Sequence, residues 1–185
     1  VTGIEPIESA QSTTPHWKVK VEGVPPLEAR SIIVATGGLS VPATGSDGTG
    51  LNLLRALGHK VNPTYPALTP LTADPHPHAT LAGVSKTVTI SAPETTPPFH
   101  TFGGFLVTHR GYSGPSVLDS SHLAIRGRPD GSRQELLVSW TDLTPSELHS
   151  ALLKGPGTVR SVLALQMPRR LAEALLLEAD VEPGT

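Results

Sequence analysis

Residues 31–50 read SIIVATGGLSVPATGSDGTG, and the rest of the chain is organised around this stretch. Its first part, IIVA at 32–35, is a short unbroken apolar run of the kind that forms a strand buried on both faces. Thr36, Gly37 and Gly38 follow, and the missing Cβ atoms of the glycines let another molecule approach the backbone closely. Open α/β sheets place their ligands where such strands end. The stretch is therefore a candidate ligand site at these three residues, although from the residues alone a tight turn between strand and loop is the better explanation.

A short helix is expected directly after this stretch. Leucines recur between Leu51 and Leu57 as on one face of a helix, and Gly58 is placed to end it in a left-handed conformation. At the start of the helix, Asp47 or Thr49 would cap the first turn. The free N–H groups of that turn would equally receive an anion. Both interpretations are open at this point.

The composition bounds the function. The chain has 185 residues, enough for one domain with a small appendage, and its net charge of −2 argues against a nucleic-acid or anionic-membrane partner. It holds no apolar run near the length of a membrane span. It has no cysteine, which excludes disulfides and thiolate metal sites and fits a cytoplasmic protein.

Short segments bounded by proline and glycine predict strands. Residues 17–21 alternate apolar and basic side chains, and residues 1–8 can pair with them. Prolines are frequent between positions 61 and 98, which disfavours helices there. Further strands are expected at 84–90, 102–108, 121–126 and 135–140. Pro129-Asp130-Gly131 is a turn signal that would join the last two as a hairpin, and the whole set predicts a small antiparallel barrel or sandwich.

The last part of the chain predicts helices. Thr144-Pro145-Ser146-Glu147 is a capping box with proline at the first helical position, so a helix should run to about Lys154. Gly155-Pro156-Gly157 would end it. Two more helices are expected, over 158–166 and from 168 or 169 to 179, the second burying Leu171, Leu175 and Leu176.

Three motifs carry a resemblance to a known family. They are VATGGLSVPATGS at 34–46, YPALTPL at 65–71 and LVTHRGYSGPSVL at 106–118. In this order and spacing they resemble the aminoacetone-oxidase-like (BaiN/YhiN type) NAD(P)/FAD-dependent oxidoreductases. Two positions depart from the family pattern, because Val41 stands where the family has tyrosine and the Gly-Asp-Gly element is shifted into 46–50.

The resemblance implies a cofactor and two groups of site residues. FAD would contact Thr36, Gly37, Gly38, Gly45 and Ser46, with NAD(P)H as a potential electron donor. The second group would lie close to the substrate or the flavin and consists of His109, Ser113, Gly114 and Pro115. Of these, His109 is the catalytic candidate. The resemblance also implies that the protein binds a small-molecule substrate.

The resemblance also implies an arrangement of domains. Family members hold the ADP part of FAD with a GxGxxG turn, which is absent because GSDGTG at 45–50 has the wrong spacing. We therefore expect an internal piece of a larger flavoenzyme, inactive without the missing FAD-domain segments and able to dimerise through exposed strand edges. The expected fold is α+β: an FAD-domain remnant with a β-meander over 1–45, a β-barrel-like middle domain over 46–142 and the start of a helical subdomain over 143–185.

Other functions fit single features of the sequence. His109 and Ser113 could pair as base and nucleophile, but Pro115 breaks the G-x-S-x-G pattern of hydrolases, and His109 could simply support a turn. Asp74, His76 and His78 would make an incomplete metal site, for which a solvated loop is the better interpretation. Arg169-Arg170 would bind an acidic surface or face solvent. The remaining alternative is a non-catalytic β-barrel binding or protein-interaction module.

Overall fold

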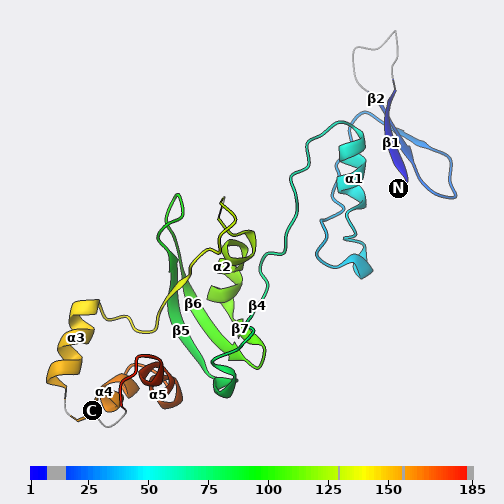
Figure 1. Cartoon of the computed structure of the whole chain (residues 1–185). Coiled ribbons are helices and arrows are strands. Elements are labelled where there is room, and N and C mark those ends of the chain that lie inside the picture. The colour runs from blue at the N-terminus through cyan, green and yellow to red at the C-terminus, as the bar shows by residue number, and fades with distance from the viewer. Residues whose placement is uncertain (8–15, 129, 156, 183–185) are drawn as a thin grey trace. The chain divides into compact units, whose positions relative to one another are not determined.

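The computed structural model describes residues 1–7, 16–128, 130–155 and 157–182 (Figure 1). Two compact units divide the chain, Val1–Thr64 and Tyr65–Thr185, and each has its own sheet. Within the described ranges, every helix falls short of the length and apolar character that crossing a bilayer requires.

The first unit is built on a three-stranded antiparallel meander. Its strands are β1 (Gly3–Ile7), β2 (His16–Lys20) and β3 (Leu27–Ala29), in that order across the sheet. The predicted pairing of the first two segments is confirmed, with Ile4 opposite Val19. A 3-10 turn, η1 (Pro42–Thr44), and helix α1 (Thr49–Ala56) complete the unit. The predicted cap is also confirmed, because Gly58 has a φ of 88° and the His59 N–H donates to the Leu54 carbonyl.

The strand predicted at 32–35 is wrong. In the described part of this unit no strand pairs with residues 31–38, and Ile33 is 91% exposed. Ile32 and Val34 are half-buried and line a small hollow with Trp17 and Leu54. The apolar run therefore buries alternate side chains, as an extended segment does when only one of its faces is covered.

The second unit contains a five-stranded antiparallel sheet. Its strands run in the order β4 (Leu71–Thr72), β7 (Gly111–Ser113), β6 (Phe99–Thr108), β5 (Ser85–Ala92) and β8 (Leu137–Ser139). The strands predicted at 84–90, 102–108 and 135–140 are confirmed, and so is the α+β class with antiparallel sheets. In the described residues β4 and β8 remain edges, so the sheet does not close into a barrel.

The strand predicted at 121–126 is wrong, because these residues form the second half of helix α2 (Pro115–Arg126). Its buried positions are Ser116, Val117, Ser120 and Ser121, a helical spacing. The serine hydroxyls bond to carbonyls of the same helix or of β6, which lets polar residues fill a buried face. The predicted turn is confirmed, because the Gly131 N–H donates to the Arg128 carbonyl over 3.0 Å; Pro129 itself lies outside the described residues. The hairpin that this turn was expected to close is wrong, because β8 pairs with β5.

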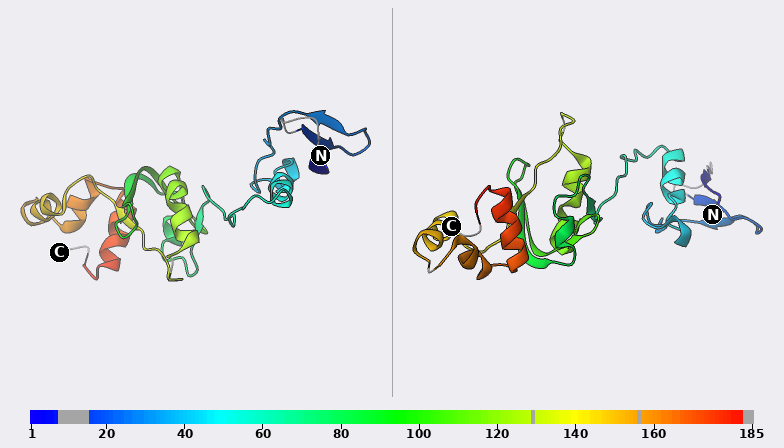
Figure 2. Two further views of the ribbon diagram at one scale, coloured as in Figure 1. Left: turned by 90° about the horizontal axis from the view of Figure 1, so that it is seen from above. Right: turned by 60° about the horizontal axis from the view of Figure 1, so that its bottom comes forward.

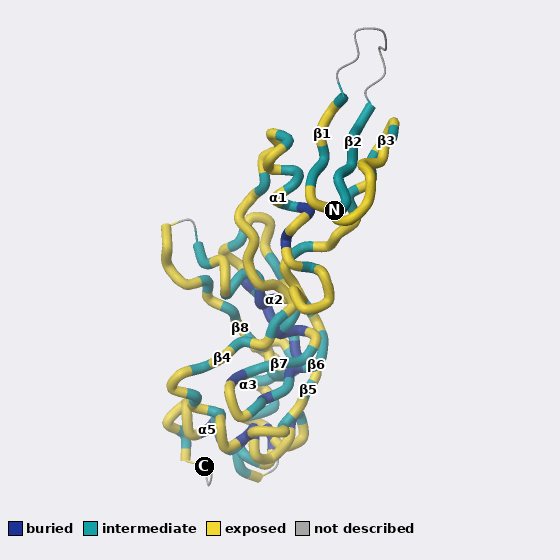
Figure 3. The backbone as a smooth tube through the Cα atoms, turned by 90° about the vertical axis from the view of Figure 1, so that its right-hand side faces the viewer, coloured by how far each residue is buried: buried dark blue, intermediate teal, exposed yellow. Residues whose placement is uncertain are grey.

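One face of this sheet carries the core. Cross-strand partners project to the same face, so the register places Val88, Ile90, Phe105, Val107 and Val138 together. On the opposite face Phe102 and Leu137 are exposed. Figure 3 shows the buried positions gathered where α2 lies against the strands.

Helix α2 and the C-terminal helices cover the core face. The C-terminal helices are α3 (Pro145–Lys154), α4 (Val159–Ala164) and α5 (Arg169–Glu178). In Figure 2 α5, in red, lies beside the strands, and α3 lies farther from them. The predicted capping box is confirmed, with both Thr144–Glu147 hydrogen bonds present. Helix α5 buries Leu171 and Leu176 against the sheet, while Leu175 is half-buried and lines a cavity.

Candidate functional site

Residues 36–50 fold into a compact loop, here called the glycine loop, that brings the predicted cofactor residues together. Gly37 has a φ of 72°, and a Cβ there would lie 3.3 Å from the Cβ of Ser46. The Gly48 N–H donates to the Gly38 carbonyl over 3.0 Å. Thr36 closes the loop at its other end, because a Cβ on Gly50 would lie 1.9 Å from its hydroxyl. Packing within the loop itself thus requires small residues at Gly37 and Gly50.

The outer surface of the glycine loop is open. Apart from the adjacent residues, no atom of the described part of the chain lies within 4 Å of the position that a Cβ would take at Gly38 or Gly45. Thr36, Gly37 and Gly45 are exposed. Ser46 is occupied inside the loop, where its hydroxyl accepts the Val41 N–H over 2.8 Å. The loop therefore offers bare backbone that a ligand can approach closely.

The start of α1 is capped by a side chain. Asp47 accepts the N–H of Thr49 over 2.9 Å, and the hydrogen bonds with Thr49 lower the pKa of the Asp47 carboxyl. Of the two interpretations of this helix start, the structure therefore shows the cap.

The structure separates the substrate-proximal residues predicted in the third motif. His109 is exposed in the two-residue turn between β6 and β7, and Ser113 pairs with Leu106 at the other end of β7. No hydrogen bond joins them, so the nucleophile–base pair does not form. Gly114 has a φ of 99° and Pro115 opens α2, so these two residues set the direction in which the helix leaves the sheet.

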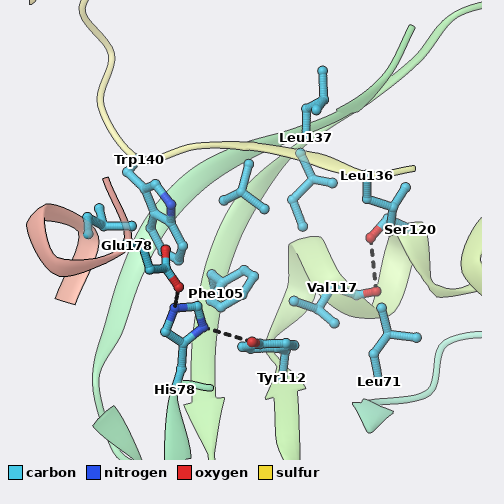
Figure 4. Close-up of a pocket in the computed structure, with 13 residues that line it drawn as sticks. Leu71, His78, Phe105, Tyr112, Val117, Ser120, Leu136, Leu137, Trp140 and Glu178 are labelled. Atoms are coloured by element: carbon cyan, nitrogen blue, oxygen red, sulfur yellow. Dashed lines mark hydrogen bonds and ion pairs between the residues drawn. The ribbon is translucent and has the colours of Figure 1, made fainter. Parts of the chain in front are cut away.

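A pocket lies on the core face of the sheet, between α2 and α5 (Figure 4). Its volume is about 410 Å³, within the range of small-molecule sites. Apolar and aromatic side chains make up most of the wall: Leu71, Ile90, Phe105, Val117, Leu136, Val138, Trp140 and Leu175. Phe105 lies between Tyr112 and Trp140, with ring centroids 5.3 and 5.0 Å away. A flat apolar ligand would be enclosed by these rings.

The polar groups at one end of this pocket form a chain of contacts. The Tyr112 hydroxyl lies 2.8 Å from Nδ1 of His78, and Nε2 of His78 lies 2.6 Å from Oε1 of Glu178. The second contact is not aligned as a hydrogen bond, so it acts as an ion pair when the ring is protonated. His76 packs against Tyr112 and bonds through Nε2 to the Thr108 carbonyl. We call Tyr112, His78 and Glu178 the polar triad.

The hydroxyl of Tyr112 keeps its proton at neutral pH. Burial raises the pKa of Tyr112, and the negative charge of Glu178 raises it further. At the opposite end Ser120 is fully buried, and its hydroxyl donates to the Ser116 carbonyl over 2.9 Å. The triad is therefore the end of the pocket whose polar groups can reach a ligand.

Reasoning from sequence missed this pocket. It considered His78 only beside Asp74 and His76, but the described residues contain no group of three or more His, Asp or Glu placed to hold a metal ion. The two histidines instead contact β6 and β7. One local signal was available, because strand alternation across the tight β6–β7 hairpin puts Tyr112 on the same face as Phe105 and Val107.

Comparison with known proteins defines the class of this chain. Residues 65–185 match the family described as the HI0933-like protein barrel and H2TH domain. The chain belongs to the HI0933-like family, and this confirms the family predicted from the three motifs.

Three curated relatives cover most of the chain. In an alignment of 188 positions that covers 95% of the chain, it is 28% identical to the 3-dehydro-bile acid delta(4,6)-reductase of Clostridium scindens. Two similar proteins are ribosomal RNA dihydrouridine synthases: that of Escherichia coli, 30% identical over 78% of the chain, and that of Haemophilus influenzae, 31% identical over 84%. The chain spans only 44%, 35% and 38% of the length of these three relatives.

Proposed function

We propose that this chain is part of an FAD-dependent oxidoreductase that reduces a carbon–carbon double bond, with NAD(P)H as the electron donor. The observation that carries the proposal is the open backbone of the glycine loop, in a chain that belongs to the HI0933-like family. The names of two kinds of relative both refer to the addition of hydrogen to a double bond: one is a delta(4,6)-reductase and the others are dihydrouridine synthases. In the balanced reaction NAD(P)H and a proton supply the two hydrogens, and NAD(P)+ is released.

The glycine loop fits an FAD molecule. A bound FAD would relay the hydride between donor and acceptor. The backbone at Gly38 and Gly45 would lie against it, because a bulkier residue would fill the open space there. Gly37, with its φ of 72°, holds the turn that presents this backbone.

The remaining part of the cofactor site would come from outside these residues. The sequence has no GxGxxG turn for the ADP part of FAD, and the chain spans less than half the length of its relatives. The missing FAD-domain segments are therefore the proposed partners, and the chain alone would be inactive. The acceptor would be a small molecule in the cytoplasm, since the net charge of −2 does not favour a nucleic acid.

Flavin binding tests this proposal directly. The 185-residue chain and the reading frame that encodes it, taken to its natural ends, would be purified in the same way. We expect the longer protein to absorb at about 450 nm, as oxidised flavin does, and the short chain to be colourless. A longer protein that takes up no FAD would refute the flavin proposal.

A matched pair of variants tests the role of the glycine loop. Gly38→Val places a side chain in open space without strain in the loop, so it should weaken FAD binding at least tenfold in the longer protein. Gly3→Val makes the same change in β1, where a Cβ would meet only the flexible side chain of Lys20. It should leave FAD binding unchanged. Equal FAD affinity in both variants would show that the glycine loop does not contact FAD.

A further inference from the structure

The pocket between α2 and α5 combines two kinds of surface. Phe105, Tyr112 and Trp140 present aromatic rings, and the polar triad occupies one end (Figure 4). Among the described residues that line the pocket, the polar side chains free to meet a ligand lie at that end. At the other end the Ser120 hydroxyl already donates to a backbone carbonyl. A ligand would therefore place its apolar body among the rings and its polar atom against the triad.

We propose that this pocket binds a flat, apolar small molecule that carries a carbonyl oxygen, and that the Tyr112 hydroxyl donates a hydrogen bond to that oxygen. With a proton on Nδ1, the His78 ring donates to the Tyr112 oxygen, while its Nε2 faces the Glu178 carboxylate. This leaves the phenolic proton for the ligand. The ligand class is a flat, apolar ketone or enone.

The charges at the triad decide between this ligand and others. An anionic ligand would be repelled by Glu178, whose carboxylate lies at the same end of the pocket. A cationic ligand would have to compete with His78 for that carboxylate, from which Nε2 is only 2.6 Å away. A neutral acceptor needs only the proton of the Tyr112 hydroxyl, which can donate one hydrogen bond while its oxygen accepts another. The triad thus favours a carbonyl.

As a statement about the substrate, this inference rests on the proposed function. A carbonyl conjugated to the double bond would be polarised by the Tyr112 hydrogen bond, which makes the bond easier to reduce. As a statement about binding, it can be tested on the chain without flavin. Failure of the flavin experiment and failure of the binding experiment are therefore distinguishable.

Tryptophan fluorescence gives the readout. The chain has two tryptophans, so the Trp17→Phe variant leaves Trp140, on the pocket wall, as the only reporter. This chain would be titrated with a two-ring and a four-ring enone, octalone and testosterone, and with the analogue of each that lacks the conjugated carbonyl. We expect saturable quenching by at least one enone, and about tenfold weaker binding of its analogue.

A pair of tyrosine variants assigns the effect to Tyr112. Tyr112→Phe removes the hydroxyl and keeps the ring, so it should weaken the enone about tenfold and leave the analogue unchanged. Tyr65→Phe makes the same change outside the pocket and should alter neither affinity. Circular dichroism would confirm that each variant is folded. The proposal is overturned if neither enone binds, or if Tyr112→Phe weakens both ligands of a pair equally.

Discussion

Gly114→Ala should destabilise the second unit by about 3 kcal/mol, because two separate costs meet at this residue. Its φ of 99° and ψ of 161° lie in a region that is almost restricted to glycine, which costs an alanine about 1–3 kcal/mol. A Cβ there would also lie 2.4 Å from the carbonyl oxygen of Gly104 and 3.2 Å from the nitrogen of Leu106. Both atoms belong to the backbone of β6, so either α2 or the strand must move.

Gly104→Ala is the matched control, on the strand that Gly114 approaches. A Cβ at Gly104 would make only an ordinary contact of 3.5 Å with the Pro115 ring, and its φ lies outside the left-handed region. Thermal unfolding would be followed by the fluorescence of Trp140 in the Trp17→Phe background. We expect a loss of about 10 °C for Gly114→Ala and little change for the control. Equal melting temperatures would show that Gly114 does not fix the path from β7 into α2.

Two further predictions concern the C-terminal helices. Leu171→Ala should lower the free energy of unfolding in urea by about 3 kcal/mol, because Leu171 is 1% exposed in the core. The control Leu177→Ala, at a 78% exposed position, should lower it by under about 0.5 kcal/mol. Equal losses would contradict the packing of α5 on the sheet. Glu147→Gln should weaken the start of α3 at pH 7. Hydrogen bonds with Thr144 lower the pKa of Glu147, so its contribution is present above the ordinary pKa and is lost as the pH falls through the lowered one. The stability difference between wild type and Glu147→Gln should therefore shrink below about pH 4, and a difference constant down to pH 2 would contradict the capping box.

The parts of the fold that were predicted from sequence are fixed by neighbouring residues. The capping box at Thr144–Glu147 satisfies its own helix N-terminus, and Gly58 ends α1 through its own backbone conformation. The alternation at 17–21 needed only the adjacent segment as a partner, and β1 supplies it. Such signals do not depend on distant parts of the chain, so they could be interpreted directly.

The wrong predictions depended on partners that sequence does not name. The run at 32–35 has the composition of a buried strand, yet no described strand pairs with it and Ile33 stays exposed. Residues 121–126 continue a helix that begins at Pro115, where Gly114 and the packing against β6 set the direction. In both cases tertiary context decided between conformations that local propensity left open.

The same distinction explains the two candidate sites. The glycine loop is local, because its residues between Thr36 and Gly50 contact one another. The motif that contains most of them implied a contact with FAD, which stays a prediction. The polar triad joins three elements, since His78 and Tyr112 are 34 residues apart and Glu178 comes from the last helix. The third motif directed attention to His109 and Ser113, but the hairpin register leaves the first in the turn and the second on the outer face. Strand alternation thus makes Tyr112, between these two residues, the one that reaches the pocket.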